Sequence, residues 1–285
     1  MTGQTLTPEL KAWLQTQKRA GVAREVAVRA MTDAGWLPSV ALAAWQGDEP
    51  SVEQEAFSWP ERPNPMQGKW PRVALAGSPR VLQLGDQTVQ VLVSLKEPHL
   101  VVLGGFLSDA ECDWLMAHAA PRMQRSLTVE ISSGGQAVND DRTSSGMFFA
   151  RGEADMLTRI EARIERLLNW PVSHGEGLQV LHYRPGAEYK PHFDYFDPKA
   201  PGTASILARG GQRVGTLLMY LNEPELGGGT VFPDLGLEVL PQRGHAVFFA
   251  YDRPHPDTQT LHGGAPVLAG EKWVATKWLR ERPFA

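Results

Sequence analysis

The triplet His192-Phe193-Asp194 places an imidazole and a carboxylate two residues apart, in a stretch that we expect to be extended. Alternate side chains of an extended chain share one face, so His192 and Asp194 can point together while Phe193 enters the opposite layer. An imidazole and a carboxylate on one face are two ligands of the kind that transition metals take. Two protein ligands are too few for a stable mononuclear site, and we therefore expect a third from a different strand.

Three histidines further along the chain could complete this set: His245, His255 and His262. His262 is favoured because it ends one expected strand and is followed by a glycine turn and a new strand that carries Lys272. His255 lies between two prolines and is better explained as a loop residue, whereas His245 fits a turn or the start of a strand. His262 is the preferred ligand, and the other two are the alternatives.

Two imidazoles and one carboxylate form the facial triad of non-haem iron(II) oxygenases, which leaves the opposite face of the metal open. There 2-oxoglutarate could bind through its C1 carboxylate and C2 ketone, beside a position for O2. Its C5 carboxylate would lie deep in the protein, where an unpaired charge is costly. Lys272, in a strand expected to be buried, could supply the cation. A zinc hydrolase can use the same three ligand types, but it needs no such lysine.

Length and composition indicate an ordinary globular protein, because 42% of the 285 residues are hydrophobic and 21% are charged. The net charge of −4 gives no general attraction to phosphate backbones or anionic membranes, so neither nucleic acid nor membrane is an expected partner. We find no signal-peptide pattern and no stretch of ~18 apolar residues. The single cysteine, Cys112, cannot form an internal disulfide. We expect a soluble, cytoplasmic protein.

The elements that must position these residues fall into three predicted parts. Residues 1–50 form a small helical module, because apolar residues recur at helical spacing between residues 7 and 46. These short helices should pack on one another or on the main domain, and could contact a partner. Residues 51–97 form a proline-rich connector followed by a β-hairpin around Gly85-Asp86. Residues 98–285 form the main domain.

Helices come first in the main domain and strands follow. Ser108 and Glu111 form a capping-box pattern before one helix, and a second helix is expected over residues 153–168. Its Glu161, Arg163, Glu165 and Arg166 are expected on a solvated face. Short runs of strand-forming residues follow at Leu178–Tyr183, Val214–Leu221, Thr230–Phe232, Leu237–Leu240, Ala246–Ala250 and Trp273–Leu279. This order favours an α+β protein with a C-terminal β-sandwich or barrel.

Several linked motifs, in this order along the chain, make the stretch from Pro98 to Pro283 resemble the catalytic domain of prolyl 4-hydroxylases. The matching segments are residues 142–148, 175–183, 213–222, 227–233 and 262–278. The resemblance implies an α+β fold with a double-stranded β-helix (jelly-roll) core and supporting N-terminal helices.

The resemblance also implies roles for particular residues. His192, Asp194 and His262 would bind Fe(II), and Lys272 would pair with the C5 carboxylate of 2-oxoglutarate. Tyr183 and Thr230 would hydrogen-bond the cosubstrate, and Trp278 would line the pocket. Tyr189, Arg213 and Arg142 would face the substrate, with Arg142 in a segment that closes over a substrate peptide in the family.

The activity implied by the resemblance is that of an Fe(II)- and 2-oxoglutarate-dependent dioxygenase. It would hydroxylate an unactivated C–H bond, of a prolyl residue in a protein or peptide, with release of succinate and CO2. Ascorbate is a further candidate cofactor. The alternatives are hydroxylation of a free amino acid or other small-molecule natural product, and a catalytically silent oxygenase fold used for binding or sensing. Fold similarity indicates the chemistry better than the target.

Overall fold

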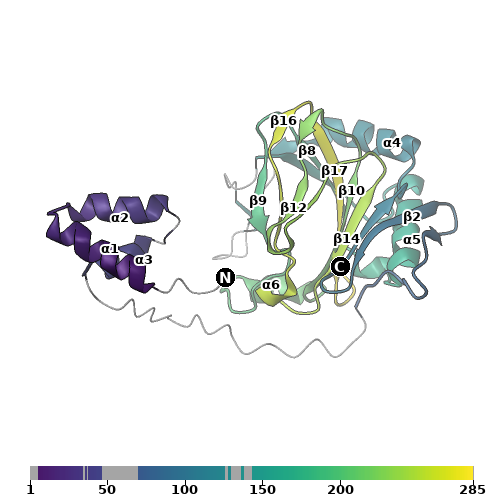
Figure 1. Ribbon diagram of the computed structural model, residues 1–285. Helices are drawn as coiled ribbons and strands as arrows, with labels where there is room; N and C mark the ends of the chain where they lie inside the picture. The colour runs from purple at the N-terminus through teal and green to yellow at the C-terminus, as the bar shows by residue number, and fades with distance from the viewer. Residues whose placement is uncertain are drawn as a thin grey trace. The chain divides into compact units, whose positions relative to one another are not determined.

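The computed structural model describes residues 6–34, 36, 38–46, 70–125, 128–129, 136–137 and 143–284. The chain divides into two compact units, one within residues 1–62 and the other within residues 63–285, coloured by position along the chain in Figure 1. Residues 47–69, which hold most of the predicted proline-rich connector, lie outside the described residues.

The N-terminal unit consists of α1 (Pro8–Arg19), α2 (Arg24–Asp33) and α3 (Pro38–Gln46). The Thr7 hydroxyl accepts a hydrogen bond from the Leu10 amide at 3.3 Å, which caps the start of α1. Leu14, Met31, Ala41 and Ala44, which come from all three helices, form a buried cluster. The three helices therefore pack on one another.

Two antiparallel sheets form the centre of the larger unit (Figure 1). In spatial order, the large sheet contains β1 (Val81–Gln83), β2 (Thr88–Leu95), β3 (His99–Gly104), β14 (Ala246–Ala250), β10 (Arg213–Tyr220), β17 (Lys272–Arg280), β8 (Leu178–Tyr183), β7 (Ser145–Phe149) and β4 (Gln124–Arg125). The small sheet contains β13 (Leu237–Val239), β12 (Thr230–Phe232), β15 (His262–Gly264) and β9 (Tyr189–His192). Two further pairs are β11 (Leu226–Gly227) with β16 (Val267–Ala269), and β5 (Thr128–Val129) with β6 (Gln136–Ala137).

From β8 onward the chain passes repeatedly between the two sheets. Strands β8, β10, β14 and β17 belong to the large sheet, and β9, β12, β13 and β15 belong to the small one. This arrangement is a double-stranded β-helix, or jelly roll, and the predicted fold class is confirmed. Its register places His262 opposite His192 and Lys272 opposite Tyr183. Residues far apart in the sequence thereby meet between the sheets.

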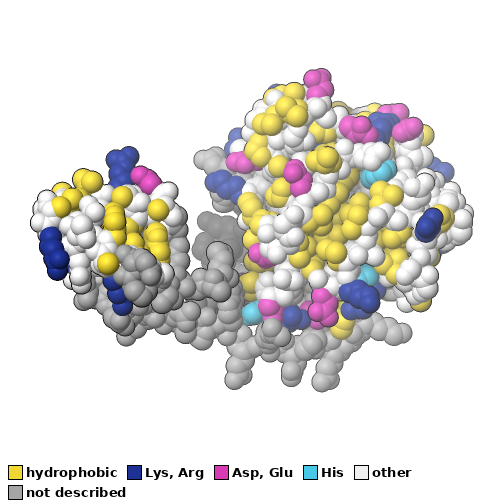
Figure 2. Space-filling view, in the orientation of Figure 1, with side chains coloured by type: hydrophobic (Ala, Val, Ile, Leu, Met, Phe, Trp, Pro, Cys, Tyr) yellow, Lys and Arg dark blue, Asp and Glu magenta, His cyan; other side chains and the backbone are white. Residues whose placement is uncertain are grey.

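Hydrophobic side chains fill the space between the two sheets. Figure 2 shows them gathered where β12 of the small sheet and β10 of the large sheet lie in Figure 1, with charged side chains toward the rim of this face. The buried set includes Leu181, Tyr220, Phe232, Phe249 and Val274. This packing holds the strands that carry the polar residues described below.

The outer face of the large sheet is covered by α4 (Asp109–Ala119) and α5 (Asp155–Leu168), seen at the right of Figure 1. Ser108 and Glu111 form the predicted capping box at the start of α4. The remaining helical segments are α6 (Thr203–Ala208), η1 (Ala120–Arg122), η2 (Val172–His174), η3 (Pro233–Leu235) and η4 (Pro256–Thr258). Among the described residues, no helix is both long and apolar enough to cross a membrane.

The prediction of a solvated face on α5 was wrong for two of its four residues. Glu161 and Arg163 are buried, whereas Glu165 and Arg166 are exposed. The Glu161 carboxylate accepts a hydrogen bond from Lys277 of β17 at 2.5 Å, and Arg163 donates to Glu111 of α4 at 2.7 Å. Charged side chains can be buried when each is paired and hydrogen-bonded, and their partners here come from distant segments.

Candidate active site

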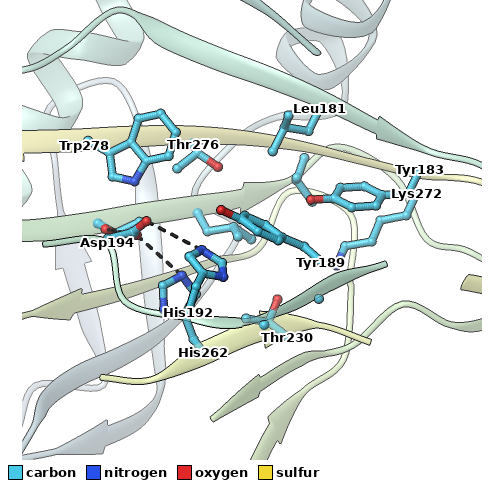
Figure 3. Close-up of a pocket in the computed structure, with 15 residues that line it drawn as sticks. Leu181, Tyr183, Tyr189, His192, Asp194, Thr230, His262, Lys272, Thr276 and Trp278 are labelled. Carbon is cyan, nitrogen blue, oxygen red and sulfur yellow. Dashed lines mark hydrogen bonds and ion pairs between the residues drawn. The ribbon is translucent and has the colours of Figure 1, made fainter. Parts of the chain in front are cut away.

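The three predicted metal ligands meet at one end of a pocket between the sheets (Figure 3). His192 ends β9, Asp194 follows two residues later, and His262 begins β15. His192 Nε2 lies 3.7 Å from Asp194 Oδ1, and His262 Nε2 lies 3.4 Å from Asp194 Oδ2. One ligand atom from each residue lies within 4.8 Å of the others. A single metal ion could bind all three.

A hydrogen bond from Nδ1 to a backbone carbonyl oxygen orients each imidazole ring. His192 Nδ1 lies 2.9 Å from the Lys190 carbonyl oxygen, and His262 Nδ1 lies 3.0 Å from the Thr260 carbonyl oxygen. A carbonyl oxygen only accepts, so we infer that Nδ1 carries the hydrogen in each ring. Nε2 then has a lone pair directed toward Asp194. Metal-binding histidines are commonly held in this way.

The Asp194 carboxylate is buried and surrounded by groups that favour its ionised form. Thr216 Oγ1 donates a hydrogen bond to Asp194 Oδ2 at 2.7 Å. Burial alone would raise the pKa of this carboxyl, but the charges of His262 and His192 when they are protonated, the charge of Arg213 and the hydrogen bond from Thr216 together lower it to about 2. Asp194 is therefore an anionic ligand at neutral pH.

Lys272 lies at the other end of the same pocket, beside Tyr183 (Figure 3). Its side chain is 2% exposed, and its Nζ lies 5.4 Å and 5.9 Å from the ring centroids of Tyr183 and Tyr220. In the part of the chain that the structure describes, no carboxylate forms an ion pair with this ammonium. Burial lowers its pKa to about 8, although Glu238 acts in the opposite direction. A buried cation without a paired anion is costly, so this end fits an anionic ligand.

Tyr183, Thr230 and Trp278 line the pocket, as predicted for residues near a cosubstrate. Thr230 Oγ1 accepts a hydrogen bond from the Tyr220 hydroxyl at 2.8 Å and keeps its own hydrogen for another acceptor. The Trp278 Nε1 atom is buried and has no hydrogen-bond partner among the described residues. A ligand with carboxylate or carbonyl oxygens could accept from both donors. Their roles toward a cosubstrate stay predictions.

The residues predicted to face the substrate have different surroundings. The Tyr189 ring lines the pocket and stacks on His192, with ring centroids 3.7 Å apart. Arg213 is partly buried, and its guanidinium lies 3.9 Å from the Trp278 ring centroid and donates two hydrogen bonds to Glu176. Arg142 lies outside the described residues. Contact of these three residues with a substrate stays a prediction.

The geometry also distinguishes the three candidate histidines. Among the described residues, the metal-capable group formed with His192 and Asp194 contains His262, and includes neither His245 nor His255. His255 caps η4, where its Nδ1 accepts from the Asp257 amide at 3.2 Å. His245 precedes β14.

Comparisons with known proteins agree with this chemistry. A model of the 2OG-Fe(II) oxygenase superfamily matches residues 178–280, which run from β8 to β17. Probable prolyl 4-hydroxylase 3 of Arabidopsis thaliana is 40% identical over 229 residues, covering 73% of this chain and 77% of the relative. Prolyl 4-hydroxylase 5 of the same plant is 39% identical over 221 residues, covering 70% and 74%. The chain belongs to the prolyl 4-hydroxylase family.

A solved structure is also similar to this member of the family. The viral collagen prolyl hydroxylase of Paramecium Bursaria Chlorella virus-1, crystallised as a 2-oxoglutarate complex, shares 32% identity with a TM-score of 0.48. The match covers 64% of this chain and 95% of the viral chain.

Family membership confirms the predicted enzyme class. The chain is a 2-oxoglutarate-dependent dioxygenase that uses Fe(II), 2-oxoglutarate and O2. The residues present fit these groups, because two imidazoles and an ionised carboxylate suit Fe(II) and leave positions open for further ligands. The buried ammonium of Lys272, which has no ion-pair partner among the described residues, suits a cosubstrate with a second carboxylate.

Sequence reasoning missed three residues that support the site: Thr216, Tyr251 and Glu176. Thr216 and Tyr251 form a hydrogen-bonded pair behind Asp194, and Glu176 holds Arg213. Glu176 and Thr216 lie in two of the segments that resemble the family, residues 175–183 and 213–222, but a lone glutamate or threonine there carries no chemical signal. Tyr251 lies outside these segments, and no spacing rule points to it.

Proposed function

We propose that this chain hydroxylates prolyl residues in a protein or peptide. The observation that carries the proposal is the iron-type triad at one end of a pocket and, at the other, the buried Lys272, which forms no ion pair with any carboxylate that the structure describes. The names of the relatives support the choice of a prolyl substrate. In the overall reaction one oxygen atom of O2 enters the C–H bond, and the other enters succinate as 2-oxoglutarate loses CO2.

The residues of the chain would divide this task between the two ends of the pocket. His192, Asp194 and His262 would hold Fe(II) on one face, with both imidazoles fixed by their Nδ1 hydrogen bonds. Fe(II) supplies the redox chemistry that activates O2 when it is bound. Lys272 would anchor the far carboxylate of 2-oxoglutarate, which orients the cosubstrate along the pocket.

Aromatic and apolar side chains on the pocket wall are consistent with a prolyl target. Tyr189, Trp278 and Leu181 line the pocket, and flat aromatic surfaces are the usual contacts of pyrrolidine rings in proline-rich peptides. The same surfaces would exclude water from the reacting carbon.

Turnover assays test the proposal directly. Purified chain would be incubated with Fe(II), 2-oxoglutarate and air, with proline-rich peptides, free proline or other free amino acids as substrates. We expect succinate release with peptides, and a peptide mass increase of one oxygen atom that fragmentation places on proline. Turnover of a free amino acid alone would favour a small-molecule hydroxylase. Binding of 2-oxoglutarate with no turnover on peptides, amino acids or lysate proteins would favour the silent binding protein.

Three finer expectations stay predictions. Ascorbate should prolong turnover, which the same assay tests when it is run with and without the reductant. The N-terminal helices are a candidate surface for a partner, and the protein is expected to be cytoplasmic. Deletion of residues 1–50 and cell fractionation test these two predictions.

A further inference from the structure

Two hydroxyl groups connect the buried tyrosine Tyr251 to the carboxylate of Asp194. Thr216 Oγ1 lies 2.7 Å from Asp194 Oδ2 on one side and 3.0 Å from the Tyr251 hydroxyl on the other. The three residues are 6%, 1% and 2% exposed in the order Asp194, Thr216 and Tyr251. Water therefore has little access to this chain of hydrogen bonds.

The direction of the hydrogens follows from what each group can donate. An ionised carboxylate only accepts, so the single hydroxyl hydrogen of Thr216 goes to Asp194. Thr216 can then only accept from its second partner, and the Tyr251 hydroxyl must be the donor. Burial raises the pKa of the Tyr251 phenol well above its ordinary value, so it keeps this hydrogen at neutral pH.

We propose that Tyr251 is a positioning residue for the metal site, acting through Thr216 on the carboxylate of Asp194. The inference rests on the proposed role of Asp194 as a metal ligand. A carboxylate can rotate about its Cβ–Cγ bond, and a hydrogen bond to Oδ2 restricts that rotation. Because the Tyr251 hydroxyl donates to Thr216 Oγ1, the hydrogen of Thr216 stays directed at Asp194. Consecutive hydrogen bonds of this kind also polarise and strengthen one another.

Restricted rotation of the Asp194 carboxylate matters because Asp194 lies between the two imidazoles. Its Oδ1 faces His192 Nε2 and its Oδ2 faces His262 Nε2, so rotation of the carboxylate would disturb both sides of the triad. Loss of a hydrogen-bonding partner of a metal ligand typically weakens metal binding about 10- to 100-fold. That range applies to Thr216, the direct partner of Asp194. Tyr251 acts one hydrogen bond further away, so we expect a smaller, several-fold weakening when its hydroxyl is removed.

The test uses the full chain without 2-oxoglutarate and measures Mn(II) affinity by titration, with Mn(II) as a probe that suits imidazole and carboxylate ligands. Tyr251→Phe keeps the ring that packs beside Phe249 and Tyr195. Tyr195→Phe is the matched control, because it removes another partly buried phenol hydroxyl nearby. We expect Tyr251→Phe to bind Mn(II) several-fold more weakly and Tyr195→Phe to bind like the parent. Thermal unfolding of each metal-free variant checks that it is folded.

A double variant separates positioning from a general structural effect. If Tyr251 acts through Thr216, Tyr251→Phe should weaken Mn(II) binding no further in a Thr216→Val background. An Mn(II) affinity of Tyr251→Phe within twofold of the parent, or an equal loss in Tyr195→Phe, would overturn the inference. So would a full additional loss in the Thr216→Val background. Failure of the parent itself to bind Mn(II) would instead refute the metal site, and this inference with it.

Discussion

His192 and His262 face each other across β9 and β15, and each ring donates its Nδ1 hydrogen to the carbonyl two residues earlier in its own chain segment. The acceptors are the carbonyls of Lys190 and Thr260. Because both Nδ1 atoms are fixed by backbone, both Nε2 atoms are available on the side where Asp194 lies. The triad is thus prepared by the strand register, before any metal binds.

Loss of either end of the His192-x-Asp194 pair should abolish cosubstrate chelation. With Fe(II) and 2-oxoglutarate under anaerobic conditions, the parent should show a visible metal-to-ligand charge-transfer band. His192→Ala and Asp194→Ala should lack this band, because two remaining ligands hold iron poorly. An unchanged band in either variant would remove that residue from the triad.

The choice of His262 as third ligand can be tested against the other two candidates. His262→Ala should eliminate turnover, whereas His255→Ala and His245→Ala should leave iron binding largely intact, because neither lies with Asp194. Iron content after anaerobic loading and desalting measures the difference. Loss of iron in His255→Ala, with retention in His262→Ala, would show that the wrong histidine was chosen.

The parts of the site that sequence could predict are those with local spacing. Alternate side chains of an extended chain share one face, which aligned His192 with Asp194. The expectation that His262 ends a strand, one turn before the strand of Lys272, was wrong in detail: His262 begins β15, and β16 lies between it and β17. Thr216 and Tyr251 could not be predicted, because they lie on β10 and just beyond β14 and reach Asp194 only through the sheet order. Cross-strand neighbours of this kind have no fixed separation in sequence.

In the fold, too, features set by neighbouring residues could be predicted, and features set by residues far apart in the sequence could not. Capping chemistry marked the start of α4, and strand-forming runs located most of the large-sheet strands. Helical spacing could not show that Glu161 and Arg163 are buried, because their partners Lys277 and Glu111 belong to β17 and α4. From sequence alone, a charged residue on a helix is predicted to be exposed, because burial requires a partner that the local sequence does not show.

Removal of the Lys272 ammonium should weaken 2-oxoglutarate binding and leave metal binding almost unchanged. Losing one partner of a buried charge pair costs ~3–5 kcal/mol, or several hundred-fold or more in affinity. Lys272→Ala should show this loss in the concentration of 2-oxoglutarate that half-saturates the charge-transfer band, whereas exposed Lys199→Ala should not. A parent-like affinity in Lys272→Ala would place the carboxylate elsewhere, with Arg213 the first residue to examine.

The lowered pKa of Lys272 predicts a pH dependence for 2-oxoglutarate affinity. Only the ammonium form pairs with the carboxylate, and in the free enzyme its pKa is about 8. Affinity should be level below that pH and fall about tenfold per pH unit above it. Lys272→Arg should bind more weakly but without this decline, because a guanidinium stays protonated. A parallel decline in both proteins would assign the effect to another group.

The same burial predicts that Lys272 destabilises the protein when no cosubstrate is bound. Its pKa falls from an ordinary 10.5 to about 8 in the folded chain, which corresponds to roughly 3 kcal/mol at neutral pH. Between these pKa values the unfolded state holds the extra proton, so parent stability should rise with pH there. Lys272→Met should be more stable than the parent in urea unfolding at pH 7, and their difference should shrink toward pH 10. Equal stability at pH 7 would contradict the prediction.

Glu176 should matter to the metal site because it holds the arginine nearest to Asp194. Its carboxylate accepts from Arg213 Nε at 2.7 Å and from Arg280 Nε at 2.7 Å, and Arg213 Nη1 lies 4.0 Å from Asp194 Oδ1. Glu176→Gln would leave the guanidinium charges of buried Arg280 and partly buried Arg213 without their anion, at a cost of ~3–5 kcal/mol in unfolding free energy. The released Arg213 would then compete with the metal for Asp194.

A buried pair elsewhere in the fold provides the matched control. Glu161 pairs with Lys277 on the outer face of the large sheet, away from the triad, so Glu161→Gln should lose a similar amount of stability. Glu176→Gln should in addition bind Mn(II) several-fold more weakly, whereas Glu161→Gln should bind it like the parent. Urea unfolding and Mn(II) titration of both variants separate the two effects. Equal Mn(II) affinities would reduce Glu176 to a purely structural residue, because its connection to Asp194 proposed here runs through Arg213.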